Sequence, residues 1–111
     1  MIKAIAAAIA IATALPAVAA PPPNPYHEQL LRMDATARNA VFRRTIRESG
    51  LACKRVVSSR FQQPYKNLMM WTVECDPARS IAIYIGTDSS VQPRYCQQSA
   101  LLKLPACAKP R

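Results

Sequence analysis

Four cysteines restrict what this short chain can fold into more than any other feature of it. The 111 residues contain Cys53, Cys75, Cys96 and Cys107, and no two of them form a C-x-x-C pair. The single histidine, His27, lies far from them in the sequence, so a zinc site is poorly supported. An even number of cysteines in an exported chain predicts two disulfides instead, and we expect no metal and no cofactor.

The N-terminal segment has the order of a secretory signal peptide. Lys3 precedes an apolar run over residues 4–15, Pro16 interrupts that run, and Ala17-Val18-Ala19 offers small residues to a signal peptidase. We predict a signal peptide over residues 1–19. A membrane anchor would need about 20 apolar residues, so this run is too short to be one. The mature protein is therefore predicted to be periplasmic or secreted, without a transmembrane segment.

The mature chain, residues 20–111, has a length that suits one small domain. A chain this short buries only about 60–65% of its surface on folding, so cross-links matter to its stability. Residues 20–33 are predicted to be a proline-rich arm with a possible short helix, capped by Asn24 and starting at Pro25. Residues 34–111 are predicted to form a single disulfide-stapled domain, with His27 solvated beside it.

The main helix is predicted over residues 35–49. Asp34 is a suitable N-cap and Gly50 a suitable left-handed stop. Phe42 and Ile46 recur at helical spacing on its apolar side. The opposite side carries the basic residues Arg43, Arg44 and Arg47, of which Arg44 has a possible partner one turn away in Glu48.

The pattern changes to strands after Cys53. Strands are predicted over residues 52–61, 68–75, 81–85 and 91–96, and the last is an edge strand because Pro93 cannot donate to a ladder. A hairpin centred near Pro64 sets the first two cysteines opposite each other, within reach of a disulfide after modest adjustment. This favours the pairs Cys53–Cys75 and Cys96–Cys107, while the other two connectivities stay open.

The predicted fold is α+β: one main N-terminal helix packed on a four-stranded antiparallel meander, with two disulfides. We expect the first hairpin to set Val57 opposite Trp71. The second should set Val73 opposite Ile83, because that register turns the isoleucines toward the helix. The expected core comprises Val41, Phe42, Ile46, Val57, Trp71, Val73, Ile81, Ile83 and Ile85.

The spacing of these residues resembles that of a group of small exported proteins of Gram-negative bacteria. In that group a helix is followed by a cysteine, a W-x-V-x-C strand, a D-G-S turn and a further cysteine. The matching residues here are Cys53, Trp71 to Cys75, Asp88-Ser89-Ser90 and Cys96, with Ser89 in place of glycine. The architecture also resembles PepSY-like and lactamase-inhibitor-like modules. Neither resemblance implies an activity, because fold does not fix function.

Motifs for catalysis are missing from the sequence. It has no G-x-S-x-G, no phosphate-binding loop with its lysine and no H-E-x-x-H. Glu74 and Asp76 lie on one side of a predicted strand, but nothing nearby predicts an apolar pocket that would raise the pKa of either carboxyl. We therefore predict that the protein is not an enzyme.

The mature chain is strongly basic. Without Lys3 it has 14 Lys and Arg residues against 6 Asp and Glu residues, a net charge of +8. Such a charge attracts anionic surfaces, and for an exported chain these are envelope lipid or lipopolysaccharide rather than nucleic acid. The arginines of the main helix, Arg43, Arg44 and Arg47, are the candidate binding residues, and an ordinary solvated helix face is the alternative. Possible additions to this surface are Arg32, Lys54, Arg55 and Arg60.

The outward face of the sheet is the second candidate surface. Leu68, Met70 and Tyr84 are predicted to point there, either exposed for a protein partner or covered by residues 30–31 or 101–102. We predict a monomeric, non-enzymatic binding protein of the cell envelope, acting as a protein-interaction or inhibitor-like module. The alternative is a cationic protein that associates with anionic envelope lipid or lipopolysaccharide.

Overall fold

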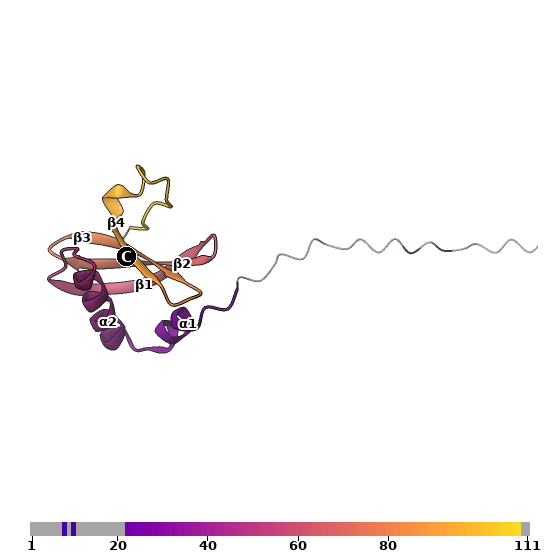
Figure 1. The fold of residues 1–111 in the computed structure, drawn as a ribbon, viewed down its shortest axis with the longest axis horizontal. Helices are drawn as coiled ribbons and strands as arrows, with labels where there is room; N and C mark the ends of the chain where they lie inside the picture. The colour runs from indigo at the N-terminus through magenta and orange to yellow at the C-terminus, as the bar shows by residue number, and fades with distance from the viewer. Residues whose placement is uncertain (1–7, 9, 11–21, 110–111) are drawn as a thin grey trace, which may run out of the picture.

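A four-stranded antiparallel sheet with two helices on one face forms the body of the molecule (Figure 1). The computed structural model describes residues 8, 10 and 22–109. The helices are α1 (Pro25–Arg32) and α2 (Ala35–Glu48), and the 3-10 turn η1 (Cys96–Gln98) follows the sheet. The strands, adjacent in chain order, are β1 (Arg55–Tyr65), β2 (Leu68–Asp76), β3 (Arg79–Gly86) and β4 (Val91–Tyr95).

The predicted α+β class and both predicted disulfides are confirmed. Cys53 and Cys75 are bonded with a Cα–Cα distance of 5.4 Å, and Cys96 and Cys107 with one of 5.8 Å. The predicted signal peptide, residues 1–19, lies outside the described residues apart from positions 8 and 10. It therefore stays a prediction.

Both helices begin at the caps that the sequence predicts. The Asn24 side chain accepts a hydrogen bond from the His27 backbone N–H at 3.2 Å, and Asp34 accepts one from Ala37 at 2.9 Å. Each bond satisfies an orphan donor of a first helical turn. At the end of α2, Gly50 has φ of +79°, a left-handed conformation that suits a residue without Cβ.

A β-bulge in β1 overturns one core prediction. Val56 pairs with Cys75 and Ser58 with Glu74, so Val57 is an extra residue on the β1 side. The extra residue shifts the alternation, which buries Val56 and leaves Val57 57% exposed. Val57 is therefore not in the core, and it does not lie opposite Trp71.

The position opposite Trp71 in β1 is occupied by Phe61. In the β2–β3 hairpin, Trp71 pairs with Ile83 and Val73 with Ile81, two residues away from the predicted register. A shift of two residues keeps every side chain on its predicted face, because strand side chains alternate with a period of two. The isoleucines therefore lie under the helices as expected.

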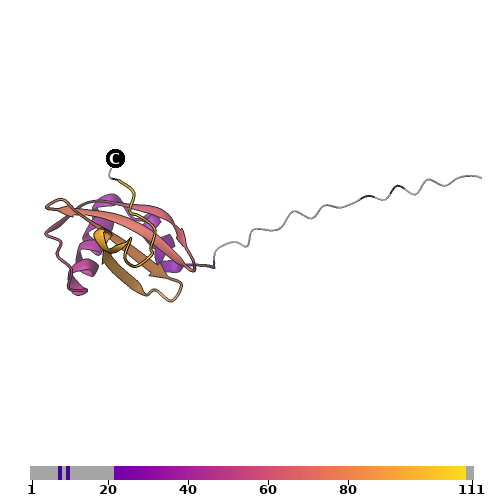
Figure 2. The same cartoon turned by 90° about the horizontal axis from the view of Figure 1, so that it is seen from above.

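The sheet has a hydrophobic core on each face. The first core lies under the helices and buries the predicted residues except Val57, which is exposed, and Val41, which is partly buried. The second core comprises Met70, Ala82 and Tyr84 on the opposite face. It is covered by the C-terminal segment, which crosses that face in Figure 2 and contributes Leu104 and the second disulfide.

The side chain of Gln62 fastens this C-terminal segment to β1. Its Nε2 donates to the Ala106 carbonyl, and its Oε1 accepts from the Ala108 N–H, both at 2.9 Å. Arg60 adds a further hydrogen bond to the carbonyl of Lys109. The Cys96–Cys107 disulfide and these hydrogen bonds together hold residues 106–109 against the sheet.

Helix α1 packs on the first core, so the packed unit includes residues that we assigned to the arm. Leu30 is fully buried, and Asn24 Nδ2 donates to the Ile85 carbonyl on β3 at 2.9 Å. No helix among the described residues combines the length and the apolar character needed to cross a membrane.

Candidate functional site

Five basic side chains gather on the surface formed by α2 and the start of β1. Arg43 Nε donates to the Lys54 carbonyl at 2.9 Å, which ties the exposed side of the helix to the strand. Shallow hollows along this surface are all lined by Arg43, with Lys54 and Arg55 at one end and Arg47 at the other. We call this surface the cationic face and define it as Arg43, Arg44, Arg47, Lys54 and Arg55, all of them exposed.

Two carboxylates neutralise part of the cationic face. Arg44 pairs with Glu48 at 3.2 Å, as the helical spacing predicts, and Arg55 pairs with Asp76 at 3.4 Å. Both pairs are largely solvent-exposed, and exposed pairs typically contribute no more than about 1 kcal/mol. A polyanion can therefore compete for these arginines.

The other three cations of the face, Arg43, Arg47 and Lys54, have no ion-pair partner in the described part of the chain. Arg43 and Arg47 belong to α2, whereas Lys54 comes just before β1. The end of the helix and the disulfide-bonded Cys53 lie between them in the sequence. The sequence predicts the helical arginines as a stripe, with Arg32, Lys54, Arg55 and Arg60 as possible additions. The structure places Lys54 and Arg55 beside Arg43, whereas Arg60 bonds to the Lys109 carbonyl. The hydrogen bond from Arg43 to Lys54 creates this junction.

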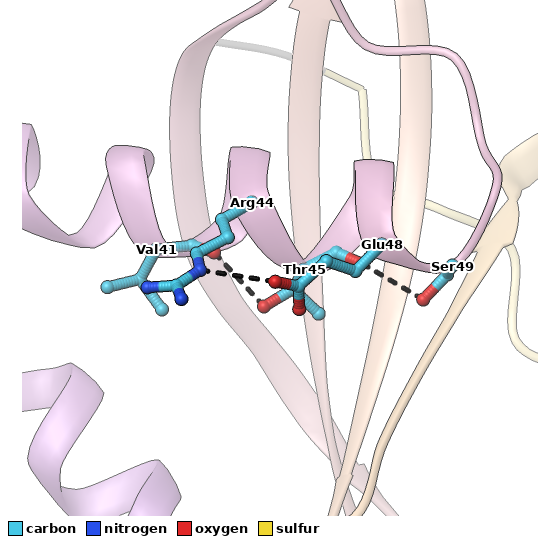
Figure 3. A network of polar contacts seen from close by, with 5 residues as sticks. All are labelled: Val41, Arg44, Thr45, Glu48 and Ser49. Atoms are coloured by element: carbon cyan, nitrogen blue, oxygen red, sulfur yellow. Dashed lines mark hydrogen bonds and ion pairs between the residues drawn. The ribbon is translucent and has the colours of Figure 1, made fainter.

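Local hydrogen bonds satisfy the other polar groups along this part of α2 (Figure 3). Thr45 Oγ1 donates to the Val41 carbonyl at 3.0 Å, and Ser49 Oγ donates to the Thr45 carbonyl at 2.9 Å. These hydroxyls return to their own helix, as is common for Ser and Thr in helices. The arginine side chains are thus the groups of this face that remain available to a ligand.

The second predicted surface is buried. Met70 is 0% and Tyr84 3% exposed, and Leu68 is partly buried against them, so the prediction of an exposed apolar patch is wrong. The predicted covers are also wrong, because Leu30 belongs to the first core and Leu101 is 86% exposed. The C-terminal residues that cover this face are Cys96, Leu104 and Cys107, and the disulfide between the two cysteines holds the chain end against the sheet.

His27 is buried, not solvated as predicted. Its Nδ1 accepts a hydrogen bond from Trp71 Nε1 at 3.0 Å, and its ring lies 4.5 Å from that of Phe61. Burial lowers the pKa of His27 below its ordinary value of 6.5, and the nearby charge of Glu28 opposes this shift. One sequence signal could have indicated the burial: His27 and Leu30 are three residues apart and share one side of a helix.

Each carboxylate on the outward side of β2 has a polar partner, although Glu74 Oε1 is buried without one among the described residues. Ser80 Oγ donates to Glu74 Oε2 at 2.6 Å, and Asp76 accepts from Arg55. The hollow that they line is open to solvent and shared with Val57 and neighbouring backbone. Within residues 22–109, no cluster of three or more His, Cys, Asp or Glu side chains is arranged to hold a metal ion.

Comparisons with known proteins give no relative: no family model, no curated protein and no solved structure matches this chain. The resemblance to small exported proteins of Gram-negative bacteria therefore stays a prediction from the residues. The function has to be argued from the surfaces described above.

Proposed function

We propose that this protein is a non-enzymatic binding protein of the cell envelope, and that its cationic face binds anionic phosphate groups of lipid or lipopolysaccharide. The observation that carries the proposal is the convergence of Arg43, Arg47 and Lys54, none of which has an ion-pair partner among the described residues. The sequence favoured a protein-interaction module acting through Leu68, Met70 and Tyr84. That role is now less favoured than the cationic alternative, because the C-terminal segment covers that face.

The charges of the face set the expected strength of binding. Each Lys or Arg near an anionic bilayer contributes about 1 kcal/mol, so three to five of them give roughly 3–5 kcal/mol. Binding of that strength is weak and reversible for one molecule, and it depends on electrostatics. It should fall steeply with salt, because the Debye length shrinks from about 10 Å at 0.1 M to about 3 Å at 1 M salt.

The test compares two charge reversals of equal size in the mature chain. Arg43→Glu with Arg47→Glu alters the cationic face, and Arg94→Glu with Lys103→Glu alters exposed residues on the side of the C-terminal segment. Sedimentation measures binding to vesicles of phosphatidylglycerol and phosphatidylcholine, and to lipopolysaccharide aggregates. We expect the first variant to lose at least about tenfold in affinity for one or both of these, and the second to lose clearly less.

Three outcomes contradict the proposal. Equal losses in the two variants mean that binding follows net charge and not the cationic face. Binding that persists unchanged from 50 mM to 500 mM salt is not electrostatic. Absence of binding to both the vesicles and the lipopolysaccharide removes the proposed ligand class.

A further inference from the structure

The buried imidazole of His27 holds helix α1 against the sheet. It is 4% exposed and packs against the rings of Phe61 and Trp71, whose centroids are 4.5 Å and 5.6 Å away from it and 5.8 Å from each other. Its Nδ1 is the acceptor for the indole N–H of Trp71, so this nitrogen carries no proton when the bond is made. The contact therefore requires the neutral imidazole.

Helix α1 has few other attachments. Asn24 donates to the Ile85 carbonyl, Leu30 inserts into the first core, and Arg38 makes long contacts of 3.5 Å to the carbonyls of Leu30 and Met33. Both disulfides join residues from position 53 onward, so no covalent cross-link holds α1. A helix of eight residues is also too short to be stable alone in water.

Protonation of His27 Nδ1 would direct its new N–H group at the indole N–H of Trp71, so the hydrogen bond would be lost. It would also place the positive charge of the imidazolium among aromatic rings. The charged groups around the site give little compensation. Glu28 on α1 favours the proton, whereas Arg38 from α2 lies 5.3 Å from the Trp71 ring centroid and adds a second cation to the cluster. The side chains that β1 and β2 place against His27 are Phe61 and Trp71, and both are uncharged.

We propose that α1 is an acid-sensitive strap, which protonation of His27 releases from the first core while the disulfide-bonded sheet and α2 stay folded. Release would uncover the Trp71 and Phe61 rings and the site of Leu30. The acidity of the surroundings would thereby control how much aromatic surface the protein presents. This inference does not depend on the cationic face or on its ligand.

The sign of the pH dependence follows from the burial of the imidazole. Burial lowers the pKa of His27 in the docked state below the 6.5 that it has when exposed. The released state therefore binds more protons, and acid favours it. Docking is at full strength above pH 6.5 and weakens as the pH falls below that value toward the pKa of the docked state.

Hydrogen exchange at pH 7.5 and pH 5.0, corrected for intrinsic rates, tests the strap in the mature chain. We expect amides of residues 27–32 to lose about tenfold in protection at pH 5.0, while β2 and β3 keep theirs. The non-titrating variant His27→Gln should remove this pH dependence. Equal pH-dependent loss in His27→Gln, or parallel loss in β2 and β3, would overturn the proposal.

A second variant keeps the test valid if His27→Gln disturbs the docking of α1. Because His27 is the only histidine, its ring proton resonance reports its titration without ambiguity. Glu28→Gln removes the charge that favours the proton, so we expect the midpoint of both the titration and the loss of protection to move to lower pH. A midpoint of protection loss that stays in place while the titration moves shows that another group controls α1.

Discussion

Loss of the second disulfide should loosen the cover of the second core without unfolding the sheet. The perturbation is Cys96→Ser with Cys107→Ser. These cysteines are partly buried, and they hold the C-terminal segment over Met70 and Tyr84, which are 0% and 3% exposed. Without the bond, the hydrogen bonds from Gln62 and Arg60 and the packing of Leu104 still hold that segment.

The magnitude follows from the length of the closed loop. A separation of 11 residues corresponds to about 2.8 kcal/mol of unfolded-state entropy at 25 °C, and the 22-residue separation of Cys53–Cys75 to about 3.4 kcal/mol. The serine hydroxyls at 96 and 107 can reach water, so we expect a loss near 3 kcal/mol, the chain-entropy value. The side chains at positions 53 and 75 are buried, so each serine hydroxyl introduced there should lower the free energy of unfolding by roughly a further 1–3 kcal/mol.

Urea unfolding of both double variants measures these losses, and binding of an apolar fluorescent dye in native buffer reports exposure of the second core. We expect the 96/107 variant to fold, bind more dye than the wild type, and lose less stability than the 53/75 variant. A loss below about 1 kcal/mol without a rise in dye binding would show that the disulfide neither restricts the unfolded chain nor holds the cover. A larger loss than in the 53/75 variant would refute the argument from burial.

Four further substitutions test the packing, each by urea or thermal unfolding. Because of the bulge in β1, Val56→Ser should cost about 1–3 kcal/mol while Val57→Ser stays within about 0.5 kcal/mol, and similar losses would contradict the observed register. Asp34→Ala removes the N-cap of α2 and should cost about 0.5–2 kcal/mol, with no loss if the cap bond is unimportant. Trp71→Phe deprives His27 of its donor and should cost at least about 1 kcal/mol, and a neutral effect would contradict the role of that bond.

Much of the local structure could be predicted because it depends on neighbours in sequence. Asn24 and Asp34 act on N–H groups three residues away, so their capping roles are readable without a fold. The alternation of Ile81, Ile83 and Ile85 indicated which side of β3 faces the helices, even though the predicted register was two residues off. The period of two makes the buried face insensitive to such an error.

The candidate site was predictable only in part. Arg43, Arg44 and Arg47 follow from helical spacing, and their exposure agrees with the expectation. The sequence offers Lys54 and Arg55 only as possible additions, alongside Arg32 and Arg60. They join the face because α2 packs beside the start of β1, and spacing within one helix cannot single them out. The prediction for the outward sheet face failed because burial depends on what covers a strand as well as on alternation within it.

The sequence by itself indicated the helix ends and the alternation of β2 and β3, because both depend on local spacing. It favoured the observed pairs of cysteines and left the other two connectivities open. Only the tertiary structure decided that Val57 turns outward at a bulge, that Met70 and Tyr84 lie under the chain end, and that His27 is buried against a tryptophan 44 residues away. These three outcomes arise from contacts between segments remote in sequence. Their free energies depend on geometry that forms only when the whole chain packs.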